Sequence, residues 1–143
     1  KAAGKQAMLE KEAQVVDKAR EDSKTPAKPV KTVKRGSDKD WEGHYNIGLK
    51  LWEDGDLEGA IKEFKTVISI NEEAAGAYYN VALCYLRAGD KSASCSYAYK
   101  AGKVYLAQNN DKQAYRMMLF IKHIDAKSSL AQRLNKEISD RAP

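Results

Sequence analysis

The chain has 143 residues, 43% apolar and 31% charged, which allows one domain with a core and extensions. No apolar run reaches the roughly 18 residues that a membrane span needs, and no signal-peptide pattern opens the chain. The net charge of +5 lies entirely in residues 1–36, which hold ten Lys or Arg against five Asp or Glu, whereas residues 37–143 hold fifteen of each. Composition therefore argues against nucleic-acid binding by the folded part and leaves only a basic tail.

The chain begins at Lys1 rather than at Met, so we expect a fragment or a processed product. The first 22 residues form the first predicted segment, an N-terminal amphipathic helix over residues 5–21. Its stripe steps by three, four and seven positions through Met8, Leu9, Glu12, Val15, Val16 and Ala19. An isolated helix of this length is marginal in water. We expect it to dock on the folded part, to pair with a second copy, or to fray.

Residues 23–37 are predicted to be a basic, extended linker. The segment holds two prolines, which oppose helix formation, and its like charges repel one another. Its cationic side chains are Lys24, Lys28, Lys31, Lys34 and Arg35. The alternative interpretation is an electrostatic tether to anionic lipid, nucleic acid or protein, so any membrane contact would be made through this N-terminal leader.

After the linker, a pattern occurs twice at an offset of 34 residues. Tyr45 recurs as Tyr79, Asn46 as Asn80, Gly55 as Gly89 and Asp56 as Asp90. In each turn, Gly supplies a positive φ that ends one helix and Asp caps the next. Apolar periodicity predicts helices over residues 40–54, 57–70, 75–88 and 91–108. A period of this length is typical of stacked helical arrays.

A third, degenerate helical pair is predicted over residues 111–124 and 126–139, with Asp125 as the cap of its second helix. Its apolar stripes are Ala114, Met117, Met118 and Ile121, then Leu130, Leu134 and Ile138. Terminal units of repeat arrays are often atypical because they shield the stack from water.

These residues resemble the tetratricopeptide repeat (TPR) family. The family motif falls on His44, Ile47, Gly48, Leu51, Ala60 and Phe64, then on Tyr78, Val81, Ala82, Tyr85, Ser94 and Ala98. The motif's proline is missing from both units. The resemblance implies an all-α fold of stacked antiparallel helix hairpins, a TPR-like α-solenoid behind the N-terminal helix and extended linker. Its TPR domain would span 38–143, with repeats at 41–74 and 75–108 and a degenerate or capping pair at 109–140.

The resemblance also implies a concave groove, lined by the first helix of each hairpin, that binds peptides. By register this face holds Glu42, Tyr45, Asn46, Leu49, Trp52, Glu53, Gly76, Tyr79, Asn80, Leu83, Leu86 and Arg87, with Gln113, Met117 and Phe120 from the third pair. Core packing is the alternative for Leu83, Leu86 and Met117. Family members that clamp chaperone C-termini need cations where Tyr45 and Ala114 stand, so that mode is disfavoured.

Cys84 and Cys95 lack a CxxC spacing, so we expect two small, semi-buried apolar residues on the helices of one repeat, with a disulfide as the alternative. The two histidines have no metal-ligand spacing, and phosphate-loop, HExxH and GxSxG motifs are missing. We therefore expect no enzyme, no metal and no cofactor.

The sequence thus predicts a non-enzymatic adaptor or scaffold whose groove binds an apolar helical or extended segment of a protein partner. The alternative is a structural or tethering component of a larger assembly, such as one of the cell envelope, that self-associates or is anchored through residues 5–21. The compartment, cytoplasm or bacterial periplasm, stays open.

Overall fold

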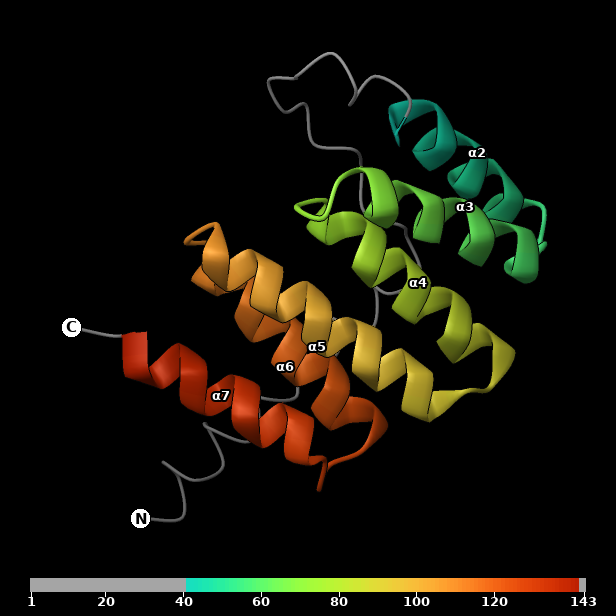
Figure 1. The fold of residues 1–143 in the computed structure, drawn as a ribbon. Helices are drawn as coiled ribbons and strands as arrows, with labels where there is room; N and C mark the ends of the chain where they lie inside the picture. Colours follow the sequence, from blue (N-terminus) through green and yellow to red (C-terminus); the bar gives the residue numbers. More distant parts are fainter. Residues whose placement is uncertain (1–40, 142–143) are drawn as a thin grey trace.

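A computed structural model of the protein describes residues 41–141, so the predicted N-terminal helix and basic linker lie outside the described residues. The described part is all-α, as predicted, and contains no strand. Its helices, labelled as in Figure 1, are α2 (Trp41–Glu53), α3 (Leu57–Ile70), α4 (Ala75–Ala88), α5 (Lys91–Ala107), α6 (Asp111–Ile124) and α7 (Ser129–Arg141).

The two Gly-Asp turns have the predicted geometry. Gly55 and Gly89 have φ of +83° and +88°, a backbone conformation that costs glycine little. Asp56 accepts a hydrogen bond from the Gly59 N–H, and Asp90 accepts one from the Ala93 N–H, both at 3.0 Å. Each pair therefore ends one helix and starts the next within a short turn.

Two polar turns differ from a Gly-Asp pair. Asn109 takes a positive φ of 58°, and Asn110 accepts a hydrogen bond from the Gln113 N–H at 3.3 Å, so two asparagines perform the same roles before α6. The prediction that Asp125 caps α7 was wrong. Its side chain accepts from the Lys127 N–H at 3.1 Å inside the turn, whereas Ser128 accepts from the Leu130 N–H at 3.2 Å. Helix α7 consequently begins three residues later than predicted.

Every helix packs against the next one along the chain, and α5 also contacts α7. Figure 1 shows them side by side in chain order, from α2 at the upper right to α7 at the lower left. Helix α4 is enclosed most completely, with nine of its fourteen residues buried.

Small side chains allow the paired helices to approach closely, as predicted. A Cβ atom added to Gly48 would lie 2.7 Å from the Phe64 ring, so α2 and α3 meet there without a side chain between them. In the next pair, the Ser94 hydroxyl donates a hydrogen bond to the Ala82 carbonyl at 2.7 Å, and both residues are fully buried.

Replacing Gly48 with Ala should destabilise the protein. Overpacking costs about 1–3 kcal/mol, which exceeds the roughly 1 kcal/mol that Ala gains over Gly in a helix. We expect the melting temperature, followed by circular dichroism, to fall by several degrees.

Gly43→Ala is the matched control, because Gly43 lies on the same helix and an added Cβ would meet nothing within 4 Å. It should raise stability by roughly 0.5 kcal/mol. Equal effects of the two substitutions would contradict the close contact between Gly48 and Phe64.

Candidate functional site

We call the predicted groove residues on α2, α4 and α6 the inner row. They are Glu42, Tyr45, Asn46, Leu49, Trp52, Glu53, Gly76, Tyr79, Asn80, Leu83, Leu86, Arg87, Gln113, Met117 and Phe120. The Asn80 side-chain amide donates a hydrogen bond to the Tyr45 hydroxyl at 2.9 Å, and this joins α4 to α2. Rings of Tyr79 and Phe120 meet edge to face with centroids 5.6 Å apart, which joins α4 to α6. These contacts bring the first helices of the three predicted pairs together.

Arg87 and Trp52 make a second link between α4 and α2. The guanidinium carbon lies 4.4 Å from the indole centroid, a cation–π distance. One guanidinium nitrogen also donates to the Trp52 carbonyl at 3.4 Å. Arg87 thus covers a buried tryptophan while its own side chain faces solvent.

The predicted groove residues divide by exposure. Those that are buried are Tyr45, Trp52, Gly76, Tyr79, Asn80, Leu83, Met117 and Phe120. Leu49, Leu86 and Gln113 are half-buried, whereas Glu42, Asn46, Glu53 and Arg87 are exposed. Most of the aromatic residues expected to touch a ligand therefore pack within the protein, and the accessible part of the inner row centres on Asn46, Leu49 and Arg87.

Leu49 lies one helical turn from both Tyr45 and Trp52 on α2, and Asn46 precedes it by three residues. An accessible apolar side chain thus lies one turn from two buried aromatic residues, and Arg87 covers the ring of one of them, Trp52. Such a surface can take an apolar segment of a partner, with polar groups at its border.

Burial controls the ionisation of the inner-row groups. It raises the pKa of the Tyr45 phenol, and the hydrogen bond from Asn80 offsets only part of that rise. On the same helix, burial raises the pKa of the Cys84 thiol to about 12, although the Arg87 charge lowers it somewhat. Both groups therefore stay neutral near pH 7.

Cys84 and Cys95 are free and buried on α4 and α5, so the prediction of two small apolar residues on one helix pair is confirmed. His44 joins α2 to α3, with Nδ1 2.6 Å from the Glu63 carboxylate. His123 lies in the last turn of α6, where it was predicted.

Within residues 41–141, no cluster of three or more His, Cys, Asp or Glu side chains could hold a metal ion. In the same range, no helix is both long and apolar enough to cross a membrane.

A second surface was missed by the sequence analysis. Lys65, Tyr97 and Lys100 meet at a cleft between α3 and α5, beside Tyr78 of α4. In the sequence, the only sign of this cleft is that Lys65 and Lys100 are 35 residues apart. Both residues are charged, so the pattern of apolar positions does not include them.

No family model matches the chain, and no curated protein matches it. Its function is therefore inferred from the packing and charge of its own residues.

Replacing Tyr45 with Phe should remove the buried hydrogen bond to Asn80 and lower the free energy of unfolding by about 1 kcal/mol. Urea denaturation followed by circular dichroism measures this. Tyr115→Phe is the control, because Tyr115 is 39% exposed and its hydroxyl can bond to water. Similar losses in both variants would contradict a structural role for the Tyr45 hydroxyl.

The stability of wild type and of Tyr45→Phe should also depend differently on pH. A pKa raised in the folded state means that stability is present below the unfolded value of 10.0 and is lost as the pH rises above it. Wild type should therefore lose stability more steeply than Tyr45→Phe above pH 10.

Proposed function

We propose that this chain is a non-enzymatic protein–protein interaction module of the TPR type, an adaptor or scaffold built from three stacked helix hairpins. The observation that carries the proposal is a recurring separation of 35 residues between contacting groups. Tyr45 bonds to Asn80, Trp52 to Arg87, and the Glu73 carbonyl accepts from the Gln108 amide at 2.7 Å. In an array with a 34-residue period, a residue in one unit meets the position next to its equivalent in the following unit.

Local geometry supports the same assignment. The turns at Gly55 and Gly89 have nearly identical φ values and identical capping distances. The small residues Gly48 and Ser94 lie where the paired helices touch. The TPR motif needs these features at these positions, because both helices of a hairpin must approach closely.

The proposed partner is a helical or extended segment with apolar side chains that packs on Leu49 beside Asn46 and Arg87. Burying about 400 Å² of apolar ligand surface contributes roughly 10 kcal/mol at about 25 cal/mol per Å². Association costs at least roughly 4 kcal/mol, which leaves a dissociation constant in the micromolar range.

A second candidate function, tethering through the N-terminal leader, is favoured by charge. Residues 41–74 hold eight Asp or Glu against three Lys, whereas residues 1–36 hold the excess of positive charge. This complementarity supports contact between the leader and the first hairpin, in the same chain or in a second copy.

Leu49→Glu tests the inner-row proposal in an affinity pull-down with partners identified by mass spectrometry. A buried charge in the interface should reduce recovery of specific partners by at least about tenfold. Ile47→Glu is the matched control, because Ile47 is on the same helix, 49% exposed, and about 200° around the helix from Leu49. Equal recovery by wild type and Leu49→Glu would contradict binding at the inner row.

Removing residues 1–36 tests the tethering function. We expect either fewer chains per particle in analytical ultracentrifugation or a lower melting temperature, according to whether the leader binds a second copy or its own domain. Glutamine in place of Lys24, Lys28, Lys31, Lys34 and Arg35 should reproduce the change if charge drives the contact. An unchanged number of chains per particle together with an unchanged melting temperature would eliminate this function.

A further inference from the structure

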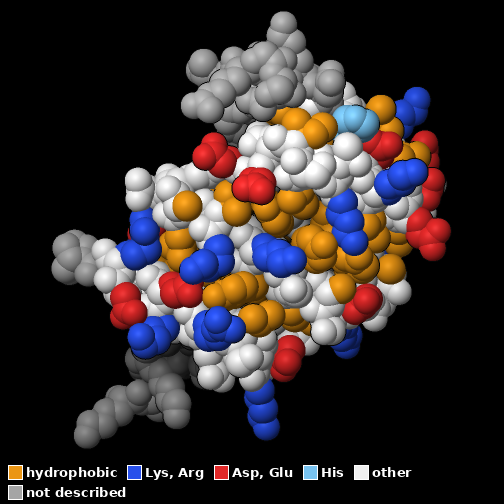
Figure 2. All heavy atoms as spheres, in the orientation of Figure 1, with side chains coloured by type: hydrophobic (Ala, Val, Ile, Leu, Met, Phe, Trp, Pro, Cys, Tyr) orange, Lys and Arg blue, Asp and Glu red, His pale blue; other side chains and the backbone are white. Residues whose placement is uncertain are grey.

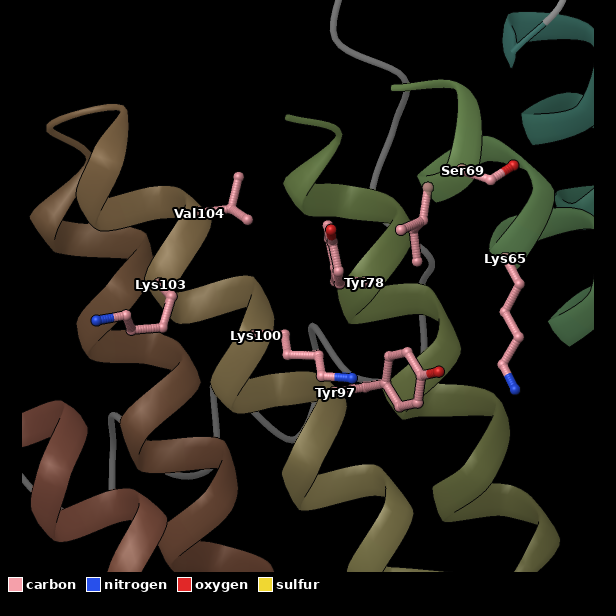
Figure 3. A pocket seen from close by; sticks show the side chains of 8 residues that line it. Lys65, Ser69, Tyr78, Tyr97, Lys100, Lys103 and Val104 are labelled. Atoms are coloured by element: carbon pink, nitrogen blue, oxygen red, sulfur yellow. The ribbon is translucent and has the colours of Figure 1, made fainter. Parts of the chain in front are cut away.

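The cleft between α3 and α5 has a volume of about 580 Å³, and Tyr78 of α4 also lines it. Figure 3 shows Tyr97 between Lys65, which comes from α3, and Lys100, which comes from α5, whereas the ammonium group of Lys103 points away from Tyr97. The apolar side chains of Ile68 and Val104 also line it. The cleft therefore combines an apolar interior with a cationic border.

Tyr97 holds the cationic border in place. The ammonium nitrogen of Lys100 lies 4.6 Å from its ring centroid, and that of Lys65 lies 5.6 Å from it. Lys65 also donates a hydrogen bond at 2.9 Å to the hydroxyl of Tyr85, whose ring stacks on Tyr97 at 5.7 Å. Two positive charges are thereby held over one aromatic ring before any ligand arrives.

These two charges lack a carboxylate partner in the described part of the chain. Lys103 differs, because it forms an ion pair with Glu137 at 3.0 Å. The hydrogen bond to Tyr85 raises the pKa of Lys65, so this group stays protonated at neutral pH. On the face presented in Figure 2, Lys and Arg side chains lie across exposed hydrophobic ones. An anionic ligand would supply the missing counter-charge.

We propose that this cleft binds an acidic peptide segment of a partner protein, independently of the inner row. One apolar side chain of the segment would pack between Ile68 and Val104, and flanking carboxylates would reach Lys65 and Lys100. A nucleic acid fits less well, because residues 41–141 hold fourteen Lys or Arg against thirteen Asp or Glu, and residues 41–74, which include α3, hold eight Asp or Glu against three Lys. A long polyanion lying across α3 would meet that negative charge.

The test uses a fluorescein-labelled peptide of Asp and Glu residues with one central Leu, and fluorescence anisotropy at low salt. The double variant Lys65→Gln, Lys100→Gln should bind at least about tenfold more weakly than wild type. Lys62→Gln with Lys122→Gln has the same net charge, replaces exposed lysines outside the cleft, and should bind within about twofold of wild type. Changing the central Leu of the peptide to Ser should also weaken binding several-fold.

Lys100→Gln alone keeps the Lys65–Tyr85 bond, so its loss of binding with an unchanged melting temperature separates recognition from folding. Equal binding by the cleft variant and the control variant would overturn the proposal. So would a lack of binding by wild type, or equally tight binding to an oligothymidylate or to phosphatidylserine vesicles. Leu49→Glu should leave this affinity unchanged, which distinguishes the cleft from the inner row.

Discussion

The close approach of α2 to α3 at Gly48 and Phe64 is the constraint on which the rest of the structure depends. Because no side chain separates the helices there, the Phe64 ring also meets Tyr45 edge to face, with centroids 5.5 Å apart. Tyr45 is held with its hydroxyl against Asn80 of α4. A contact inside the first helix pair thus fixes where the second pair begins, and fully buried hydrogen-bonded groups make that register specific.

Helix α4 contacts α2, α5 and α6, and so positions these helices relative to one another. Its inner side bonds to Tyr45 and meets Phe120, while the Ala82 carbonyl on its other side accepts from Ser94. Burial on both sides leaves few accessible residues on α4, among them Arg87 on the inner row and Tyr78 and Tyr85 on the outer side. The packing that stabilises the six helices therefore leaves little of the α4 surface accessible.

The turn and capping residues could be predicted from the sequence. Which residues of each helix are buried in the core and which are accessible could be predicted less well. Gly55 and Gly89 identify their turns in the sequence, because positive φ and helix capping depend on residues that are close together in the chain. Tyr45 and Tyr79 have the register of a ligand-facing side, but helical periodicity cannot tell a residue that meets a ligand from one that meets the next helix. The cleft was invisible to an apolar pattern because Lys65 and Lys100 are charged, and only packing brings them to Tyr97.

The inner row and the cleft are proposed to bind chemically different ligands, but both surfaces include residues of α4. Tyr78 and Tyr79 are adjacent on α4 but face the cleft and the inner row respectively, because successive helical residues point about 100° apart. One helix therefore fixes both sites, and a substitution that displaces α4 would weaken both together. Lys100 is exposed and Leu49 packs partly against the core, so an unchanged melting temperature is what shows that either substitution acts on one surface alone. Selective loss of one ligand thus reports recognition, whereas simultaneous loss of both reports a change in the packing of α4.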